Sequence, residues 1–252
     1  MNLSKQLLIF VICLCSVTSA FAQPEIPQKV LFVGNSYTYF WNLPQTVQAM
    51  AKEKGISLTT RQTTAGGSHW GHHWRGDRQL KTVSILEENN FDAVVLQNHS
   101  MSTINRVDSM YHFGQRLVNL AKKKEAQIYL YMTWAREWNP YMQATITEEY
   151  IKLAGKLNAR IVPVGPAWER ARQLRPGFPL YDDDGSHPSP LGTYLTACVF
   201  YGIFTNQTPV GLPNRLVSTD KDGEKLYLTI QSRENALFCQ KVAEEIINQL
   251  VD

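Results

Sequence analysis

A serine near the start of the chain and an aspartate–histidine pair near its end have the residue types needed for acyl transfer. Ser36 lies in a Gly-Asn-Ser segment, and Asp184 precedes His187 by three residues. A serine hydroxyl is a weak nucleophile until a base takes its proton, and histidine can serve as that base. A carboxylate on the other ring nitrogen fixes the histidine tautomer. We therefore expect Ser36 to be the nucleophile, His187 the base and Asp184 the orienting carboxylate.

Attack by a serine would create a negatively charged oxygen, and three groups are candidates to bind it. Ser36 would supply its backbone N–H, Gly66 a second backbone N–H, and Asn98 a side-chain amide. Donors that are already in place stabilise charge that develops in the transition state. Gly67 and Gln97 are alternatives to Gly66 and Asn98.

Aromatic and basic residues follow the same predicted strands. Four tryptophans, Trp70, Trp74, Trp134 and Trp138, fall in predicted loops, and Arg136 lies between the last two. Flat aromatic faces stack on sugar rings, and a guanidinium binds carboxylates or hydroxyls. We expect Trp70, Trp134 and Arg136 to bind substrate, which favours glycans over lipids. The alternative is that the rings close the loops over the core.

Three closely spaced histidines, His69, His72 and His73, raise the question of a metal site. No carboxylate lies at helical spacing within this group, and no sulfur ligand is evident nearby. We therefore expect no metal and no cofactor. The histidines would line the substrate site or have a structural role, and His99 would support its neighbours rather than react.

A repeated pattern of strand followed by helix must position these residues. Most of the predicted strands are continuous apolar runs, typical of strands covered on both faces. They span residues 29–34, 57–63, 92–97, 127–132 and 160–164. The predicted helices span residues 43–54, 107–123, 141–157, 190–204 and 234–250. In an open parallel sheet, ligands bind at the carboxyl ends of the strands, where the candidate residues lie.

Local signals refine this pattern. Asn42 is the expected N-cap of the first predicted helix, and Ser189, followed by proline, that of the fourth. A turn at residues 221–223 predicts a hairpin within 208–230. Cys198 and Cys239 both fall on helical segments, as buried free thiols or as a disulfide between packed helices.

The first residues have the pattern of a secretory signal peptide. Lys5 precedes an apolar run at residues 7–15, and Ala20-Phe21-Ala22 provides a cleavage site. We therefore expect a signal peptide at residues 1–22, a single domain at residues 23–252, and export to the periplasm or the medium. No later segment is apolar enough over its length to predict a membrane span.

The composition narrows the class of protein. The chain has 252 residues, of which 44% are hydrophobic and 19% charged, as in globular proteins. A formal net charge of +3 argues against a dedicated nucleic-acid binder. No Gly-x-Ser-x-Gly motif occurs, so the nucleophile elbow of the α/β-hydrolases is not supported.

Three sequence blocks resemble those of the SGNH (GDSL-type) hydrolases, a family of esterases, lipases and carbohydrate deacetylases. The segment VLFVGNSYT resembles the block with the nucleophile, which matches Ser36. The first glycine of the AGGS segment, Gly66, matches an oxyanion donor, and DDDGSHPS matches the Asp-x-x-His block with Asp184 and His187. The resemblance implies a three-layer, flavodoxin-like α/β/α fold with a five-stranded parallel sheet in the order 2-1-3-4-5.

Two blocks depart from the family pattern. The first has Gly-Asn-Ser where Gly-Asp-Ser is usual. The third reads Leu-Gln-Asn-His instead of Gly-x-Asn-Asp, so Asn98, which keeps the residue type of the block, is preferred over Gln97 as the donor.

These observations together predict a secreted serine esterase that removes acetyl or another short acyl group from a carbohydrate. One alternative is a lipase or lysophospholipase of the same fold, and another is a non-catalytic glycan-binding module. Metal-dependent hydrolysis through the histidine group is a further alternative. The acyl group, the alcohol and the oligomeric state stay open.

Overall fold

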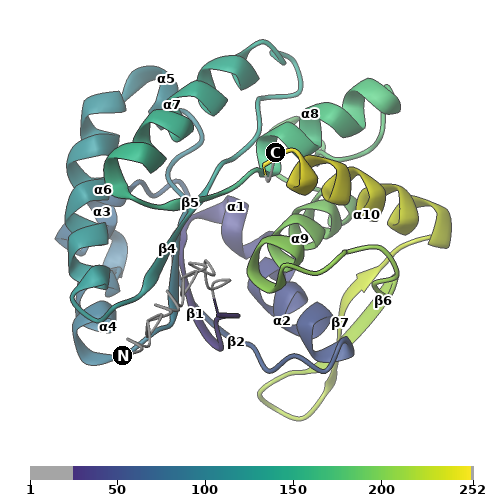
Figure 1. The fold of residues 1–252 in the computed structure, drawn as a ribbon, viewed down its shortest axis with the longest axis horizontal. Helices are drawn as coiled ribbons and strands as arrows, with labels where there is room; N and C mark the ends of the chain where they lie inside the picture. The colour runs from purple at the N-terminus through teal and green to yellow at the C-terminus, as the bar shows by residue number, and fades with distance from the viewer. Residues whose placement is uncertain (1–24, 251–252) are drawn as a thin grey trace, which may run out of the picture.

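A computed structural model of the chain describes residues 25–250, so the expected signal peptide lies outside the described residues. Five parallel strands form a sheet in the order β2-β1-β3-β4-β5 (Figure 1), as the resemblance implies. The strands are β1 (Lys29–Gly34), β2 (Thr59–Thr64), β3 (Ala93–Leu96), β4 (Gln127–Tyr131) and β5 (Arg160–Val162).

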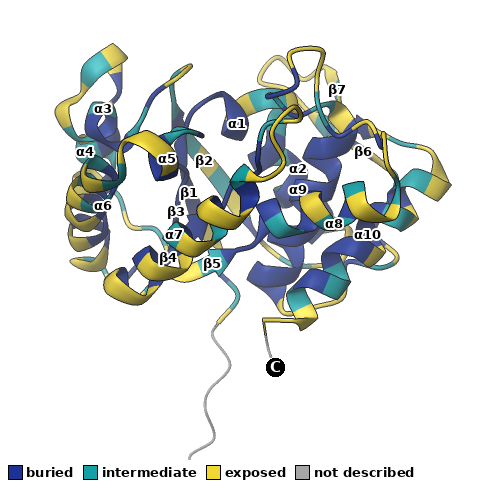
Figure 2. Cartoon of the chain, turned by 90° about the horizontal axis from the view of Figure 1, so that it is seen from above, coloured by how far each residue is buried: buried dark blue, intermediate teal, exposed yellow. Residues whose placement is uncertain are grey.

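Helices cover both faces of this sheet (Figure 1). One face is covered by α2 (Leu43–Glu53), α8 (Val164–Leu174), α9 (Pro190–Thr205) and α10 (Arg233–Asn248). The other is covered by α3 (Trp70–Arg75), α4 (Thr82–Glu88), α6 (Val107–Lys122) and α7 (Met142–Leu157). Each face has its own hydrophobic core, and Figure 2 shows the sheet buried between the two helical layers. The three-layer α/β/α architecture is confirmed.

Apolar patterning explains most of these elements. β3 is apolar and buried at every position because helices cover both its faces. By contrast, β2 is a polar edge strand with alternating burial, and it begins two residues later than predicted. α9 is buried along nearly its whole length because α2 and α10 pack against it. Its predicted N-cap is confirmed, since Ser189 Oγ accepts a hydrogen bond from Gly192 N at 3.0 Å.

Other local predictions had mixed outcomes. Asn42 occupies the predicted N-cap position of α2, but its backbone is left-handed (φ 55°) and its side chain makes no capping bond. The predicted hairpin is present as β6 (Arg215–Thr219) and β7 (Lys225–Ile230), which pair antiparallel. Cys198 and Cys239 are both free and buried. Within residues 25–250, no helix is long and apolar enough to cross a membrane.

Candidate active site

Ser36 follows the carboxyl end of strand β1, which lies between β2 and β3, and is the first residue of the short helix α1 (Ser36–Tyr39). Asn35 caps this helix, with its Oδ1 accepting a hydrogen bond from Tyr37 N at 3.0 Å. Its Nδ2 donates to the carbonyl oxygens of Ser68 at 2.9 Å and Asn98 at 3.4 Å. An aspartate could not donate these two bonds. The unusual asparagine of the Gly-Asn-Ser segment therefore ties the loops after β2 and β3 to the serine.

Ser36, His187 and Asp184 form a continuous hydrogen-bonded chain. His187 Nε2 lies 2.8 Å from Ser36 Oγ, although the two residues are 151 positions apart. His187 Nδ1 is hydrogen-bonded to Asp184 Oδ2. Asp184 Oδ1 accepts further bonds from the backbone N–H groups of Ser186 at 2.9 Å and His187 at 2.8 Å. The turn between them needs Gly185, whose φ is +61°.

The surroundings of Asp184 favour its ionised form. Burial alone would raise its pKa, but hydrogen bonds from the His187 side chain and from the two backbone N–H groups outweigh this and lower the pKa below its ordinary value. An ionised Asp184 accepts the Nδ1–H of His187. That tautomer leaves Nε2 free to accept the proton of Ser36.

Aromatic rings hold the histidine in place. The Phe40 ring stacks on His187 with ring centroids 4.5 Å apart, and Tyr37 meets it edge-on at 5.6 Å. Trp41 Nε1 donates a hydrogen bond to Pro188 O at 2.8 Å. These supporting rings were missed in the sequence, although the run of aromatic residues directly after Ser36 was the available signal. They fix His187 beside the serine.

The side-chain amide of Asn98 is oriented so that its Nδ2 can donate a hydrogen bond to the oxyanion. Its Oδ1 accepts from the backbone N–H groups of Trp70 at 3.0 Å and His99 at 2.9 Å, which directs Nδ2 away from them. Among residues 25–250, no protein atom accepts a hydrogen bond from this Nδ2. The alternative donor, Gln97, is buried, and its Oε1 accepts from Asn35 N at 2.8 Å. The geometry therefore favours Asn98 over Gln97.

The glycine loop after β2 is anchored to the end of β1. Gly66 is exposed, and its carbonyl oxygen accepts a hydrogen bond from Arg78. Gly67 adopts a left-handed conformation with φ +60°, which makes the turn. At the next residue, Ser68 Oγ donates to Gly34 O at 2.9 Å. The loop thus carries the Gly66 N–H beside α1.

His73 completes this anchor from α3. Its Nε2 lies 3.0 Å from Gly34 O and 3.1 Å from Ser68 Oγ, and its Nδ1 lies 2.7 Å from Thr82 Oγ1. A carbonyl oxygen only accepts, so Nε2 carries the proton and Nδ1 accepts from Thr82. Burial lowers the pKa of His73 to about 4, so the ring is neutral at pH 7. Its role is to hold the loop.

The other histidines of the group are also used locally. His69 caps α3, with its Nδ1 accepting from Gly71 N at 3.1 Å, and its ring stacks on His72 with centroids 3.6 Å apart. In the part of the chain that the structure describes, no group of three or more His, Cys, Asp or Glu side chains could hold a metal ion.

Two of the predicted substrate-binding residues are buried instead. Trp70 and Trp134 are each only 1% exposed, so the prediction that they bind substrate is wrong. Trp70 is the first residue of α3, and its ring packs into the hydrophobic core on that face of the sheet. Trp134 lies between the parallel rings of Tyr37, at 4.5 Å, and Trp168, at 3.8 Å, and donates a hydrogen bond to Ser186 O. It therefore supports the loop that carries His187.

Arg136 is bonded to residues that follow Ser36 and Asn98 in the chain. Its Nη1 donates to Tyr37 Oη and its Nη2 to Ser100 Oγ, both at 2.8 Å. Its guanidinium carbon lies 5.8 Å from the Tyr37 ring centroid and 5.9 Å from that of Trp138. Trp138 is 68% exposed. Arg136 and Trp138 are therefore accessible where Trp70 and Trp134 are not.

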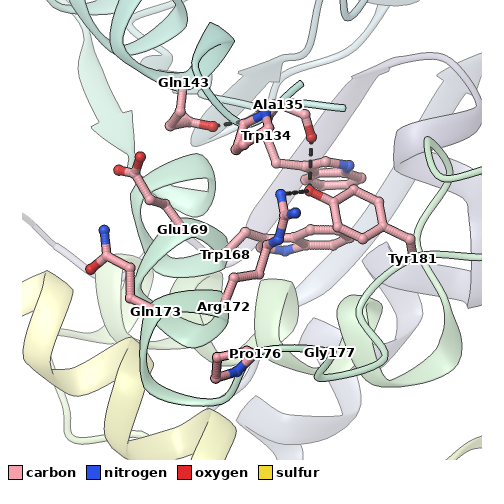
Figure 3. Close-up of a pocket in the computed structure, with 11 residues that line it drawn as sticks. Trp134, Ala135, Gln143, Trp168, Glu169, Arg172, Gln173, Pro176, Gly177 and Tyr181 are labelled. Atoms are coloured by element: carbon pink, nitrogen blue, oxygen red, sulfur yellow. Dashed lines mark hydrogen bonds between the residues drawn. The ribbon is translucent and has the colours of Figure 1, made fainter. Parts of the chain in front are cut away.

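A pocket of about 310 Å³ lies behind this loop, and Figure 3 shows its lining. Gln143 Oε1 accepts from Ala135 N at 2.9 Å, and Tyr181 Oη donates to Ala135 O at 2.8 Å. Arg172 in turn donates to Tyr181 Oη at 3.2 Å (Figure 3). Ser36, Asp184 and His187 are not among the residues that line this pocket. These contacts hold both sides of the Ala135 peptide and so position Arg136.

Comparison with solved structures identifies the fold. A DUF4886 family protein from Bacteroides uniformis matches with 20% identity and a TM-score of 0.73, over 89% of this chain and 96% of that one. A candidate SGNH hydrolase from Slackia heliotrinireducens matches with 22% identity and a TM-score of 0.60, over 69% and 97%. The psychrotrophic esterase EstA from Pseudoalteromonas, in a structure inhibited by monoethylphosphonate, matches with 14% identity and a TM-score of 0.53, over 69% and 94%. No family model and no curated protein matches. The fold is that of the SGNH hydrolases, as the sequence blocks predicted.

Proposed function

We propose that this chain, with its SGNH hydrolase fold, is a serine-dependent carboxylic ester hydrolase that removes acetyl or another short acyl group from a carbohydrate. The observation that carries the proposal is the 2.8 Å contact between Ser36 Oγ and His187 Nε2, with Asp184 bonded to the other ring nitrogen. This is the arrangement that makes a serine hydroxyl nucleophilic.

In the proposed reaction, Ser36 Oγ attacks the ester carbonyl carbon while its proton passes to His187 Nε2. The carbonyl oxygen becomes an oxyanion that accepts hydrogen bonds from Ser36 N, Gly66 N and Asn98 Nδ2. The carbon–oxygen bond to the alcohol breaks, and the alcohol leaves with the proton from His187. Water then gives a proton to His187 and attacks the acyl-serine, which releases the carboxylic acid and returns the proton to Ser36.

The accessible groups around the serine favour a polar substrate over a long acyl chain. Trp41 and Trp138 are 44% and 68% exposed, and both contact the segment that carries His187. Exposed indole faces are suited to stacking on sugar rings. Polar residues also lie near the serine: Asn98 is bonded to Asn35, and Arg136 to Tyr37, on either side of Ser36 in the chain. The proposal of a glycan substrate therefore rests on the exposed Trp41 and Trp138, and not on the buried Trp70 and Trp134.

Turnover of p-nitrophenyl acetate by the wild type and by Ser36→Ala tests the proposal. We expect hydrolysis by the wild type and loss of turnover in Ser36→Ala, with an unchanged circular dichroism spectrum. Ser218→Ala, in the β6 strand of the hairpin, is the matched control and should retain full turnover. Equal rates for wild type and Ser36→Ala would refute the proposed mechanism.

The substrate class has its own test. A chain-length series of p-nitrophenyl esters from acetyl to dodecanoyl, run beside acetylated oligosaccharides, should show a preference for the shortest acyl group and release of acetate from the sugars. A preference for the longest chains would favour a lipase instead.

Export is proposed from the N-terminal pattern described above. N-terminal sequencing of the protein recovered outside the cytoplasm should begin at Gln23. An uncleaved N-terminus would contradict this part of the proposal.

A further inference from the structure

Six basic side chains lie around the candidate oxyanion donors, and we call them the basic rim. They are Arg78, Arg106, Arg136, His69, His72 and His99. In the part of the chain that the structure describes, no carboxylate forms an ion pair with any of the three arginines. Two of the acidic groups nearby are engaged elsewhere: Asp77 pairs with Arg75 at 2.9 Å, and Asp184 with His187. Among the described residues, the arginines of the rim therefore have no ion-pair partner.

Contacts place three members of the rim beside the candidate oxyanion donors. Arg78 donates a hydrogen bond to Gly66 O, in the glycine loop. His99 follows Asn98 in the chain, and its backbone N–H donates to Asn98 Oδ1 at 2.9 Å. Arg136 is bonded to Ser100, two residues after Asn98. The rim thus adjoins Gly66 and Asn98, two of the three candidate donors.

The charges of the three arginines converge on His99. Burial is the largest cause that lowers the pKa of this residue, followed by the positive charges of Arg136, Arg106 and Arg78. His69 shows the same effect: burial, then the charges of His72 and Arg106, lower its pKa to about 4. At pH 7 the arginines therefore carry the charge of the rim.

Arg136 is the member best placed to bind a ligand. It is half-buried, and Tyr37 and Ser100 each accept one of its five N–H bonds, so donors remain for a further partner. The Tyr37 and Trp138 rings hold the planar guanidinium in one orientation. A held guanidinium with free donors suits bidentate binding of a carboxylate or another oxyanion.

We propose that the ester hydrolysed at this site carries an anionic substituent that binds to Arg136 in the basic rim. On a carbohydrate this substituent would be the carboxylate of an acidic sugar. On the acyl side it would be a second carboxylate of the acid. This inference rests on the proposed esterase function and adds the charge of its substrate.

Matched pairs of esters test the inference. On the acyl side, mono-p-nitrophenyl succinate is compared with its neutral methyl ester. On the alcohol side, para-acetoxybenzoate is compared with its methyl ester. We expect kcat/KM of the wild type to be at least about tenfold higher for the anionic member of one pair, and added salt to reduce this advantage. The pair that shows it identifies the side of the ester that carries the charge.

Substitutions then assign the effect to the rim. Arg136→Gln should lower the ratio of kcat/KM for the anionic and neutral members about tenfold. Arg215→Gln, at an exposed position of β6, should keep the wild-type ratio. An arginine that acted only on the oxyanion would lower both members equally and leave the ratio unchanged, which would overturn the inference.

The possible failures are distinguishable. If the neutral esters are hydrolysed and charge changes kcat/KM by less than about twofold, the inference is wrong and the esterase proposal stands. If no ester of either pair is hydrolysed, both fail.

Discussion

Replacement of His73 by glutamine should remove much of the acid sensitivity of this fold. His73 is 1% exposed, and burial lowers its pKa to about 4 from the ordinary value of 6.5. The unfolded chain therefore binds a proton between these two values that the folded chain does not, so stability is present above pH 6.5 and is lost as the pH falls toward 4. The full effect amounts to about 3 kcal/mol, of which about 2 kcal/mol is lost by pH 5.

Urea unfolding at about pH 7.5 and pH 5 measures this difference. Since the pKa of His69 is also lowered, the readout is the loss in the wild type minus the loss in His73→Gln, with about 2 kcal/mol expected. Glutamine retains a donor and an acceptor but does not titrate in this range. His112→Gln, at an exposed position of α6, is the matched control and should lose as much as the wild type. An equal loss in wild type and His73→Gln would refute the assignment of a neutral, buried His73.

Three further substitutions test the site in steady-state assays with p-nitrophenyl acetate. Asn98→Ala should lower kcat about a hundredfold or more with little change in KM, because its donor acts on the oxyanion; a change confined to KM would contradict that role. Asp184→Asn should lower kcat by up to about ten-thousandfold by favouring the wrong histidine tautomer, and a loss below about tenfold would argue against it. Gly185→Ala would place a Cβ 2.9 Å from the Trp138 ring at a φ of +61°, so we expect loss of turnover and about 1–3 kcal/mol of stability. Gly223→Ala, also at positive φ but with open space around it, should lose stability and keep turnover; equal turnover in both variants would contradict the account of the loop.

The central part of the fold was predictable from the sequence because its strands are buried on both faces. β1 has the bounds that its continuous apolar run predicts, and β3 and β4 differ by one or two residues. The half-exposed edge strand β2 gives a weaker pattern, which is why its start was misplaced. The short helices α1 and α3, of four and six residues, carry no periodic stripe that a sequence pattern could reveal.

Site residues could be predicted from the sequence where their position after a strand decides their place. The direction in which an aromatic ring points could not be predicted in this way. Ser36 and Asn98 follow parallel strands, whose carboxyl ends meet at one edge of the sheet, so their proximity could be expected. Trp134 also follows a strand, but its ring turns inward because Trp168, from a helix more than thirty residues later, stacks on it. Residue type and spacing carry no information on that distant partner.

Covalent labelling by a serine-directed fluorophosphonate tests the central claim most directly, because the reagent reacts with a serine only when a base has activated it. Intact-mass and peptide analysis should find a single adduct, on Ser36, that forms in step with loss of esterase activity and is absent in Ser36→Ala. An unlabelled wild type, or an adduct on another residue while Ser36→Ala still hydrolyses esters, would contradict the account.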